Sequence, residues 1–406
     1  MNVRRSAAVL AATAVIGAAT PAVAATPSPS PSVAIPSGLY GSTDPTYDGV
    51  WRQSLALLAQ HTADVKPAAK AVDWLAGQQC ASGAFAAFRA DTARPCDAKL
   101  VVDTNSTAAA AQALAALGGH ATAVDKAVTW LKSVQNTDGG WGFNPGGASD
   151  TNSTSVVVGA LVAAGEKPAE VTRGGKSPYD LLAKWSLPCG EDDGGALAYQ
   201  PDKKGKLAAN ADATAAGVLA ALGKGFVTTA GQAPKDSHAC ADSDQQPTPQ
   251  QVAGNGAAYL AEATQDGFLK SVLPGAKNQP DFGNTADAVV ALAAQGSASA
   301  ARKPYAWLEK NATPWATQSG PAAYAQLILA AHALGSDPHD FGGTDLVKQL
   351  DASGPAPEES AKTTAKDSDK KGSDDGFGTW WAVGVFFVAS IGIGFLLSSR
   401  NRKQQP

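Results

Sequence analysis

Apolar and polar positions along this chain recur in a repeated block. Residues 103–118 begin Asp-Thr-Asn-Ser-Thr, continue as an apolar run and end in Gly, and residues 150–165 repeat this pattern at the same spacing. Asp281, Thr285, Leu292 and Gly296 repeat it again, and weaker copies start at Asn210 and Ser319. Asp, Asn or Thr caps the free N–H groups at a helix start, and Gly adopts the left-handed conformation that ends a helix. Each block therefore predicts one helix.

These blocks predict two layers of helices. The first set is apolar nearly all round, which requires burial on most faces and predicts an inner layer: residues 47–60, 103–118, 150–165, 210–223, 281–296 and 319–335. More amphipathic segments alternate with them and predict an outer layer: residues 67–79, 123–135, 177–185, 255–263, 301–311 and 344–350. Six such pairs without a visibly polar end favour a closed ring, although an open solenoid would use the same pattern. The predicted fold is all-α, a ring of six helical hairpins at residues 44–351.

The N-terminus has the layout of a secretory signal. Residues 1–24 contain Arg4-Arg5, an apolar run and Ala22-Val23-Ala24. Residues 25–43 follow as a Ser/Pro-rich linker. We therefore expect export of the mature chain.

The C-terminus predicts a membrane anchor. Residues 352–378 are rich in Ser, Lys, Asp and Gly and predict a disordered stalk. Residues 379–398 include an uncharged apolar run from Trp380 to Leu397, long enough for one membrane-spanning helix, and basic residues follow in the tail at 399–406. The predicted location is the cell membrane, with a single span, the body outside the cell and a short cytoplasmic tail.

Composition narrows the partners and the role of cysteine. Charged residues make up 17% of the chain and the net charge is -4, so no basic patch predicts a nucleic-acid partner. Four Cys in an exported chain predict disulfides, and four allow three pairings. We favour Cys80 with Cys96 and Cys189 with Cys240, because each bond would close one long insertion between helices.

A specific motif adds a family resemblance. Trp130-Leu131 is followed by Gln135 and by Asp-Gly-Gly-Trp-Gly-Phe at 138–143. This resembles the repeat shared by squalene and terpene cyclases and the protein prenyltransferase β subunits, which implies an (α/α)6 toroid. In that family the Trp and Gln of the repeat, here Trp130, Gln135 and Trp141, are structural. The layout is also similar to the α domain of the cobalamin carriers intrinsic factor and transcobalamin.

The chemistry that the resemblance implies is missing from the expected motifs. Class II cyclases of the family protonate their substrate with Asp-x-Asp-Asp, which does not occur here, and the nearest acidic run is Glu191-Asp192-Asp193, a weak candidate for catalysis. Five scattered His do not match a zinc ligand set, so we expect no metal and no cofactor. Cys189-Gly190-Glu191-Asp192 resembles the thioester motif of complement-like toroids, but Asp192 replaces the required Gln, so no thioester is expected.

A ligand-binding mouth is expected where the inner helices begin. N–H dipoles, polar side chains and aromatic rings gather there in a toroid of this kind. Each polar candidate could instead cap a helix, and each aromatic candidate could pack under a loop. The candidates are Asp103, Asn105, Trp141, Phe143, Asp150, Asn152, Tyr199, Asn210, Asp212, Asp281, Asn284 and Trp315.

The leading functional hypothesis is a membrane-anchored, extracellular, non-catalytic binding protein. It would capture a small ligand in this mouth, with a corrinoid as the first guess, or a partner. Because the second domain of the cobalamin carriers is absent, a membrane transporter or a second protein would have to close over the ligand. One alternative is a terpene cyclase or prenyltransferase-like enzyme acting on a membrane lipid. The other is a surface adhesive or structural module.

Overall fold

The computed structural model describes residues 34–232, 239–242, 244–272 and 276–358. The expected signal peptide, most of the stalk, the predicted membrane span and the tail lie outside these ranges. Thirteen α-helices and four two-residue strands occur within them. Among the described helices, none combines the length and the apolar character that crossing a bilayer requires.

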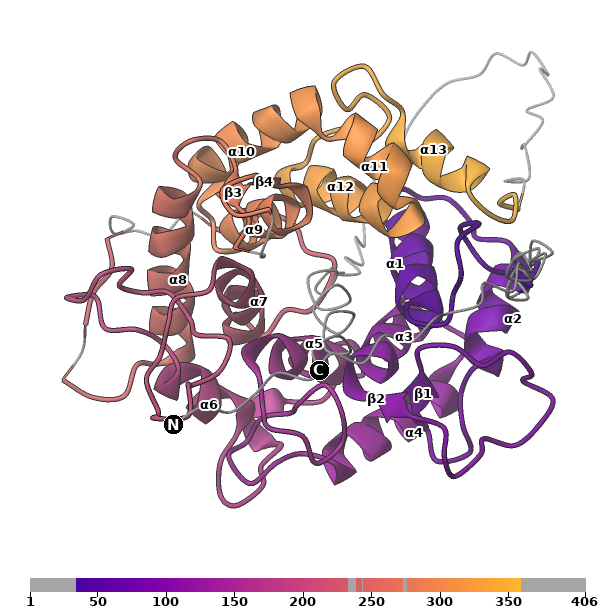
Figure 1. Ribbon diagram of the computed structural model, residues 1–406, viewed down its shortest axis with the longest axis horizontal. Helices are drawn as coiled ribbons and strands as arrows, with labels where there is room; N and C mark the ends of the chain where they lie inside the picture. Colours follow the sequence, from indigo (N-terminus) through magenta and orange to yellow (C-terminus); the bar gives the residue numbers. More distant parts are fainter. Residues whose placement is uncertain (1–33, 233–238, 243, 273–275, 359–406) are drawn as a thin grey trace, which may run out of the picture. The chain divides into compact units, whose positions relative to one another are not determined.

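Six inner helices form a closed ring (Figure 1). Each packs against the next, and the last packs against the first, so the closed arrangement is confirmed. Ala, Val and Leu dominate these helices and are buried along their length, which explains why they carry few charges. The inner helices are α1 (Gly49–Thr62), α3 (Thr104–Leu117), α5 (Thr151–Ala163), α7 (Ala211–Ala221), α9 (Phe282–Ala294) and α12 (Pro321–Leu334).

The second layer surrounds this ring. Its members pack on the inner helices and expose their polar faces: α2 (Ala69–Gly77), α4 (Ala121–Ser133), α6 (Pro178–Lys184), α8 (Pro249–Ala263), α10 (Ala298–Asn311) and α13 (Leu346–Ala352). A 3-10 turn at Pro168–Glu170 precedes α6. The sequence pattern did not predict α11 (Thr313–Ser319), which begins with a Pro at its first turn and ends at Gly320, where φ is +82°. Outer helix α8 also starts six residues earlier than expected, because Thr248 and Gln251 form a capping box before the predicted start.

The repeated polar block has a defined structural role in each inner helix. Asp103 and Asp150 accept hydrogen bonds from the backbone N–H groups of Ser106 and Ser153, each at 2.6 Å. Asn210 and Asp281 cap α7 and α9 in the same way. These bonds satisfy N–H groups that a helix start leaves unpaired. The expected capping is therefore confirmed.

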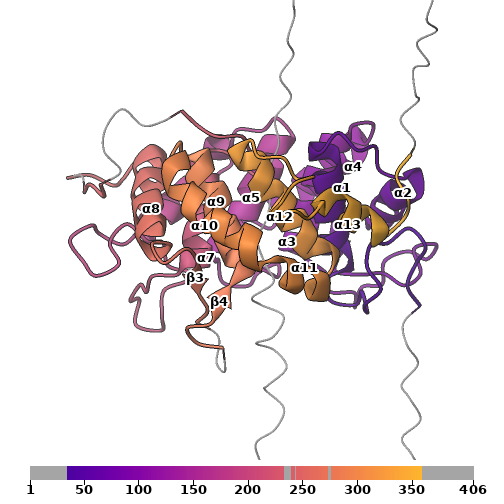
Figure 2. The ribbon, with the colours of Figure 1, turned by 90° about the horizontal axis from the view of Figure 1, so that it is seen from above.

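A second device of the block was not predicted from the sequence. Four residues after each cap, a Thr hydroxyl accepts a backbone N–H from the loop that precedes the helix. The pairs, with distances between 2.9 and 3.0 Å, are Phe85 with Thr107, Trp141 with Thr154, Leu197 with Thr214, and Leu269 with Thr285. Each loop is thus tied to the start of its inner helix. Two of them pair as short strands, β1 (Phe85–Ala86) with β2 (Val102–Asp103) and β3 (Leu269–Lys270) with β4 (Pro280–Asp281). Figure 2 shows β3, β4 and α11 on the same face of the ring.

The connection that leaves α7 crosses the interior of the ring. Phe226 donates its backbone N–H to Gln112 of α3, and its ring meets the Trp51 ring of α1 edge-on at 5.5 Å between centroids. At the preceding residue, Gly225, an added Cβ would come within 2.5 Å of the Cα of Gly159 on α5, so only glycine allows this approach. Residues 225–227 therefore form a floor across the ring, partway along the inner helices.

Candidate functional site

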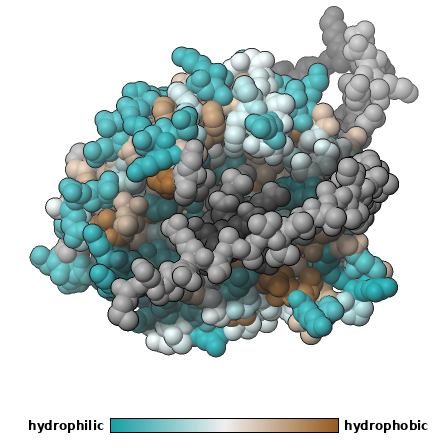
Figure 3. All heavy atoms as spheres, viewed as in Figure 1, coloured by the Kyte–Doolittle hydropathy of each residue, from teal (hydrophilic) through white to brown (hydrophobic). Residues whose placement is uncertain are grey.

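A cavity of about 810 Å³ opens where the inner helices begin. Its lining is mainly apolar and comes from the start of α1, α3 and α5, from the loops before them, and from Tyr199, Ser319 and Ala322. The aromatic members are Tyr47, Trp51, Phe88, Phe143 and Tyr199. In the space-filling view of the face that carries β3, β4 and α11, brown patches lie inside a mostly teal edge (Figure 3). The volume falls within the range of small-molecule pockets, about 300–1,000 Å³.

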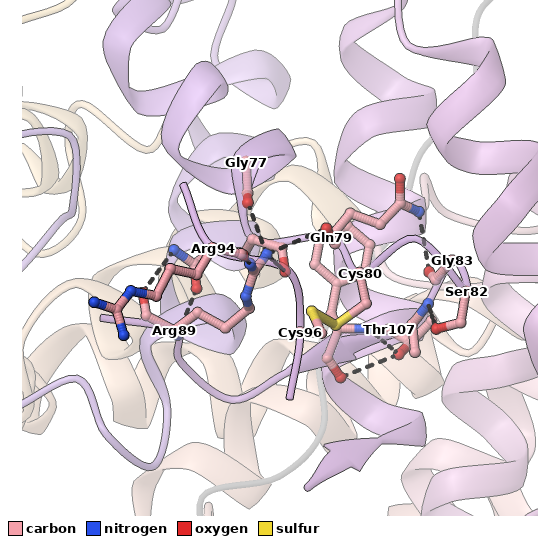
Figure 4. Close-up of a disulfide and its surroundings, with 12 residues drawn as sticks. Gly77, Gln79, Cys80, Ser82, Gly83, Arg89, Arg94, Cys96 and Thr107 are labelled. Carbon is pink, nitrogen blue, oxygen red and sulfur yellow. Dashed lines mark hydrogen bonds between the residues drawn. A yellow bond between two sulfur atoms is a disulfide. The ribbon is translucent and has the colours of Figure 1, made fainter. Parts of the chain in front are cut away.

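One wall of the cavity is the loop between α2 and α3, which a disulfide closes (Figure 4). Cys80 and Cys96 are bonded, and Phe88 and Val101 of the same loop line the cavity. The Arg89 guanidinium lies inside the loop and donates to the backbone carbonyls of residues 77–79 and 94. This wall is thus held covalently and by hydrogen bonds. Cys189 is bonded to Cys240, so both favoured pairings are confirmed, and Cys189 has no free thiol for a thioester.

Two helix caps line the cavity as buried carboxyls. Burial raises the pKa of Asp103 and that of Asp150 to about 6, and the hydrogen bonds from Ser106 and Ser153 oppose this shift only in part. Burial also raises the pKa of Tyr199, whose hydroxyl interacts with Asp150. Because both carboxylates cap helices, structure alone accounts for their presence.

Asp212 is different, because the cap of its helix is Asn210. It lies in the first turn of α7, and its Oδ2 accepts a 2.6 Å hydrogen bond from Nδ2 of Asn152 on α5. Its Oδ1 is buried and has no hydrogen-bond partner among the described residues. Burial raises the pKa of Asp212 to about 6, and the carboxylates of Asp281 and Asp150 add to the rise. Asp212 is therefore a half-buried residue with a buried carboxyl oxygen and no capping role.

The repeat explains how this acid arises. Two residues after the cap, α3 carries Asn105 and α5 carries Asn152, both of which line the cavity. In α7 the two residue types are exchanged, with Asn at the cap and Asp two residues later. The segment Asn-Ala-Asp-Ala at 210–213 keeps only the third position of Asp-x-Asp-Asp. Asp212 was predicted as a ligand contact, and this exchange of Asp and Asn was the signal that could have indicated an acid.

The remaining predicted residues are divided between the cavity and its surroundings. Trp141 is fully buried and donates its indole N–H to the Leu131 carbonyl, as the structural role of the repeat implies. Asn284 interacts with the cap Asp281 at the start of α9. Trp315 stacks on Phe282, which stacks in turn on Trp307, on a part of the ring outside the cavity lining.

The acidic run predicted as a weak catalytic candidate lies elsewhere. Glu191, Asp192 and Asp193 are exposed on a turn beside the Cys189–Cys240 disulfide, and none lines the cavity. Within the described ranges, no three His, Cys, Asp or Glu side chains converge as a metal site would require.

A known protein family matches part of this ring. Residues 48–214 match the model of the prenyltransferase alpha-alpha toroid domain. Residues 48–214 of this chain are thus similar to the prenyltransferase and terpene cyclase toroid family. The family predicted from the motif at 130–143 is thereby confirmed.

One curated relative of this toroid is an enzyme. The drimenyl diphosphate synthase of Streptantibioticus cattleyicolor is 41% identical over 80 residues, which are 20% of this chain and 13% of that protein. This finding corrects the leading hypothesis of a non-catalytic binding protein with a corrinoid ligand, and it favours the enzyme alternative. The matched part of the chain spans only 13% of the relative's length.

Two solved structures resemble the toroid more loosely. The ent-copalyl diphosphate synthase from Streptomyces platensis is 16% identical with a TM-score of 0.47, covering 71% of this chain and 50% of that one. A protein from Actinoplanes is 14% identical with a TM-score of 0.48, covering 74% of this chain and 94% of that one. Both TM-scores are below 0.5.

Proposed function

We propose that this toroid is an enzyme of the terpene cyclase type, which starts a redox-neutral rearrangement of an isoprenoid by protonating a carbon–carbon double bond. The observation that carries the proposal is Asp212, a buried carboxyl whose Oδ1 has no partner, adjacent to a residue that lines an apolar cavity. The relative named as a drimenyl diphosphate synthase supports the same class of reaction.

The chemistry follows from the environment of Asp212. An acid must be protonated before it can donate, and burial keeps the proton on Asp212 up to a pH of about 6. The proton passes from the carboxyl to one alkene carbon, and the positive charge forms on the other. A later loss of a proton from the cation restores the balance, so the reaction needs no oxidant or reductant.

The cavity wall suits a cationic intermediate. Faces of Trp, Tyr and Phe stabilise a cation through their quadrupoles, and Trp51, Phe88 and Tyr199 line the cavity. A mainly apolar lining also limits the access of water, which would otherwise trap the cation. In this proposal Asn152 is a positioning residue, since it fixes Oδ2 of Asp212 and leaves Oδ1 for the proton.

The location outside the cytoplasm, with the membrane as a source of lipid, is part of this proposal. The two disulfides within the described residues support it, because disulfides persist in oxidising compartments.

The test is product formation by the full-length protein on a panel of acyclic isoprenoids that includes farnesol, geranylgeraniol, squalene and farnesyl diphosphate, analysed by gas chromatography and mass spectrometry. We expect a cyclised or rearranged product from at least one compound, and a loss of about 100-fold or more in Asp212→Asn. Asp192→Asn is the matched control, because Asp192 is exposed and outside the cavity. Equal activity of Asp212→Asn and the wild type would show that Asp212 is not the acid.

A further inference from the structure

The cavity contains acidic groups but no basic group among the described residues that line it. Asp48, Asp103 and Asp150 belong to the lining, and no Lys, Arg or His does. The nearby Arg52 is neutralised, since its Nη1 lies 3.1 Å from the Asp48 carboxylate and its Nη2 donates to the Thr43 carbonyl. A diphosphate would bring its negative charges next to these carboxylates without a compensating cation.

Two buried amide oxygens at this cavity have no hydrogen-bond donor. They are Asn105 Oδ1 and Asn152 Oδ1, and neither has a hydrogen-bond partner among the described residues. Asn152 is only 6% exposed, and both Asn residues line the cavity. Buried acceptors are costly to leave unpaired, so these two oxygens favour a ligand that donates hydrogen bonds.

We infer that the substrate is an isoprenoid with a hydrogen-bond-donating head, a hydroxyl or an ammonium, and that the cavity discriminates against a diphosphate head. This inference rests on the proposed function and names its substrate class. The hydrogen-bond donors of the head pair with the unpartnered oxygens of Asn105 and Asn152, while the hydrocarbon chain lies along the aromatic wall. The proposed substrate differs in its head from the diphosphate in the name of the curated relative.

The test compares three ligands with the same fifteen-carbon chain: farnesol, farnesylamine and farnesyl diphosphate. Binding to the full-length protein is followed by its tryptophan fluorescence, because Trp51 lines the cavity. We expect saturable binding of the alcohol and the amine. The dissociation constant of the diphosphate should be larger by about tenfold or more. Tighter binding of the diphosphate would overturn this inference and leave the proposed function standing. Failure of all three to bind would also overturn this inference, whereas the proposed function is overturned only if none of the panel of acyclic isoprenoids yields a product.

A positive charge added to the cavity lining tests whether the lack of a cation causes the weaker binding of the diphosphate. Val101 lines the cavity and is 69% exposed, so Val101→Lys introduces a cation without disturbing the core. We expect the ratio of the dissociation constant for farnesyl diphosphate to that for farnesol to fall by about tenfold in this variant. Val272→Lys is the matched control, since Val272 is 79% exposed and lies outside the lining. If the ratio of the two dissociation constants is unchanged in Val101→Lys, the absence of a cation is not the cause, and the inference fails.

Discussion

Asn152 and Asp212 belong to neighbouring inner helices, and the amide of Asn152 donates a 2.6 Å hydrogen bond to one oxygen of the Asp212 carboxylate. This bond favours the charged form and lowers the pKa of Asp212, while burial raises it more strongly, to about 6. The balance between the two effects sets the pH at which the buried acid loses its proton.

Removing the hydrogen bond should move that pH upward. In Asn152→Ala, the anionic form of Asp212 loses its donor, so its pKa rises, and the fall in activity at high pH should shift to a higher pH. The measurement is the pH dependence of kcat on a turned-over isoprenoid. Asn105→Ala, at the corresponding position of α3, has no hydrogen bond to Asp212 and should leave the midpoint in place. Equal midpoints for the wild type and both variants would contradict the role of Asn152.

The raised pKa of Asp212 also predicts a pH-dependent stability. The folded state holds this proton up to a pH of about 6, whereas an unfolded Asp releases it near 3.8. Stability contributed by the proton is therefore present at low pH and lost as the pH rises from about 4 to about 6. Asp212→Asn cannot ionise, so its free energy of unfolding should exceed that of the wild type by on the order of 1 kcal/mol at pH 4.5 and by on the order of 3 kcal/mol at pH 7.5.

Urea denaturation at the two pH values measures this difference. The exposed Asp192→Asn serves as the control and should show no comparable change between pH 4.5 and 7.5. A stability gain for Asp212→Asn that is equal at both pH values would mean that Asp212 is ionised throughout.

Phe226→Ala should change the chain-length preference. Phe226 is buried against Trp51, which lines the cavity, so the substitution should cost about 3–5 kcal/mol of stability and leave space behind Trp51 into which the cavity can extend. We expect relative affinity to shift from fifteen-carbon toward twenty-carbon isoprenoids in a binding titration. Phe341→Ala, which also empties a fully buried site but lies against Tyr305, should lose stability without this shift. The same shift in both variants would indicate general loosening of the fold.

The two disulfides should differ in their effects. By loop length, removal of Cys189–Cys240, which closes 51 residues, should cost about 4 kcal/mol, and removal of Cys80–Cys96, which closes 16, about 3 kcal/mol. The shorter loop contributes Ala86, Ala87 and Phe88 to the cavity lining, whereas the longer one contributes Tyr199. We therefore expect paired Cys→Ser substitutions at 80 and 96 to weaken ligand affinity more, although they cost less stability. Denaturation and binding titrations on both double variants test this inversion, and equal losses of affinity would contradict it.

The ring itself could be predicted from the sequence, and parts of the site could not. Asp103 and Asp150 followed by apolar runs indicate helix starts, because capping and burial act locally and leave a periodic pattern. The role of Thr107 in binding the N–H of Phe85 depends on a loop 22 residues away in the sequence, which no local pattern reveals. The floor at Phe226 likewise depends on contacts with α1 and α3 that are distant in the chain.

Asp212 could be identified in the sequence as a polar candidate, but its role as an acid could not be predicted there. Asp212 differs from its repeat partners Asn105 and Asn152 only in its position relative to the cap. The burial and the neighbouring carboxylates that raise its pKa arise only when α5, α7 and α9 are brought together.

Incorporation of solvent deuterium tests the central claim most directly. An acyclic isoprenoid turned over by the full-length protein in D₂O should yield a product with one deuterium bonded to carbon, because the proton on Asp212 exchanges with solvent before it is transferred. Asp212→Asn should form no labelled product, while Asp192→Asn should label as the wild type does. A cyclised product that contains no deuterium, or a labelled product from Asp212→Asn, would contradict protonation by Asp212.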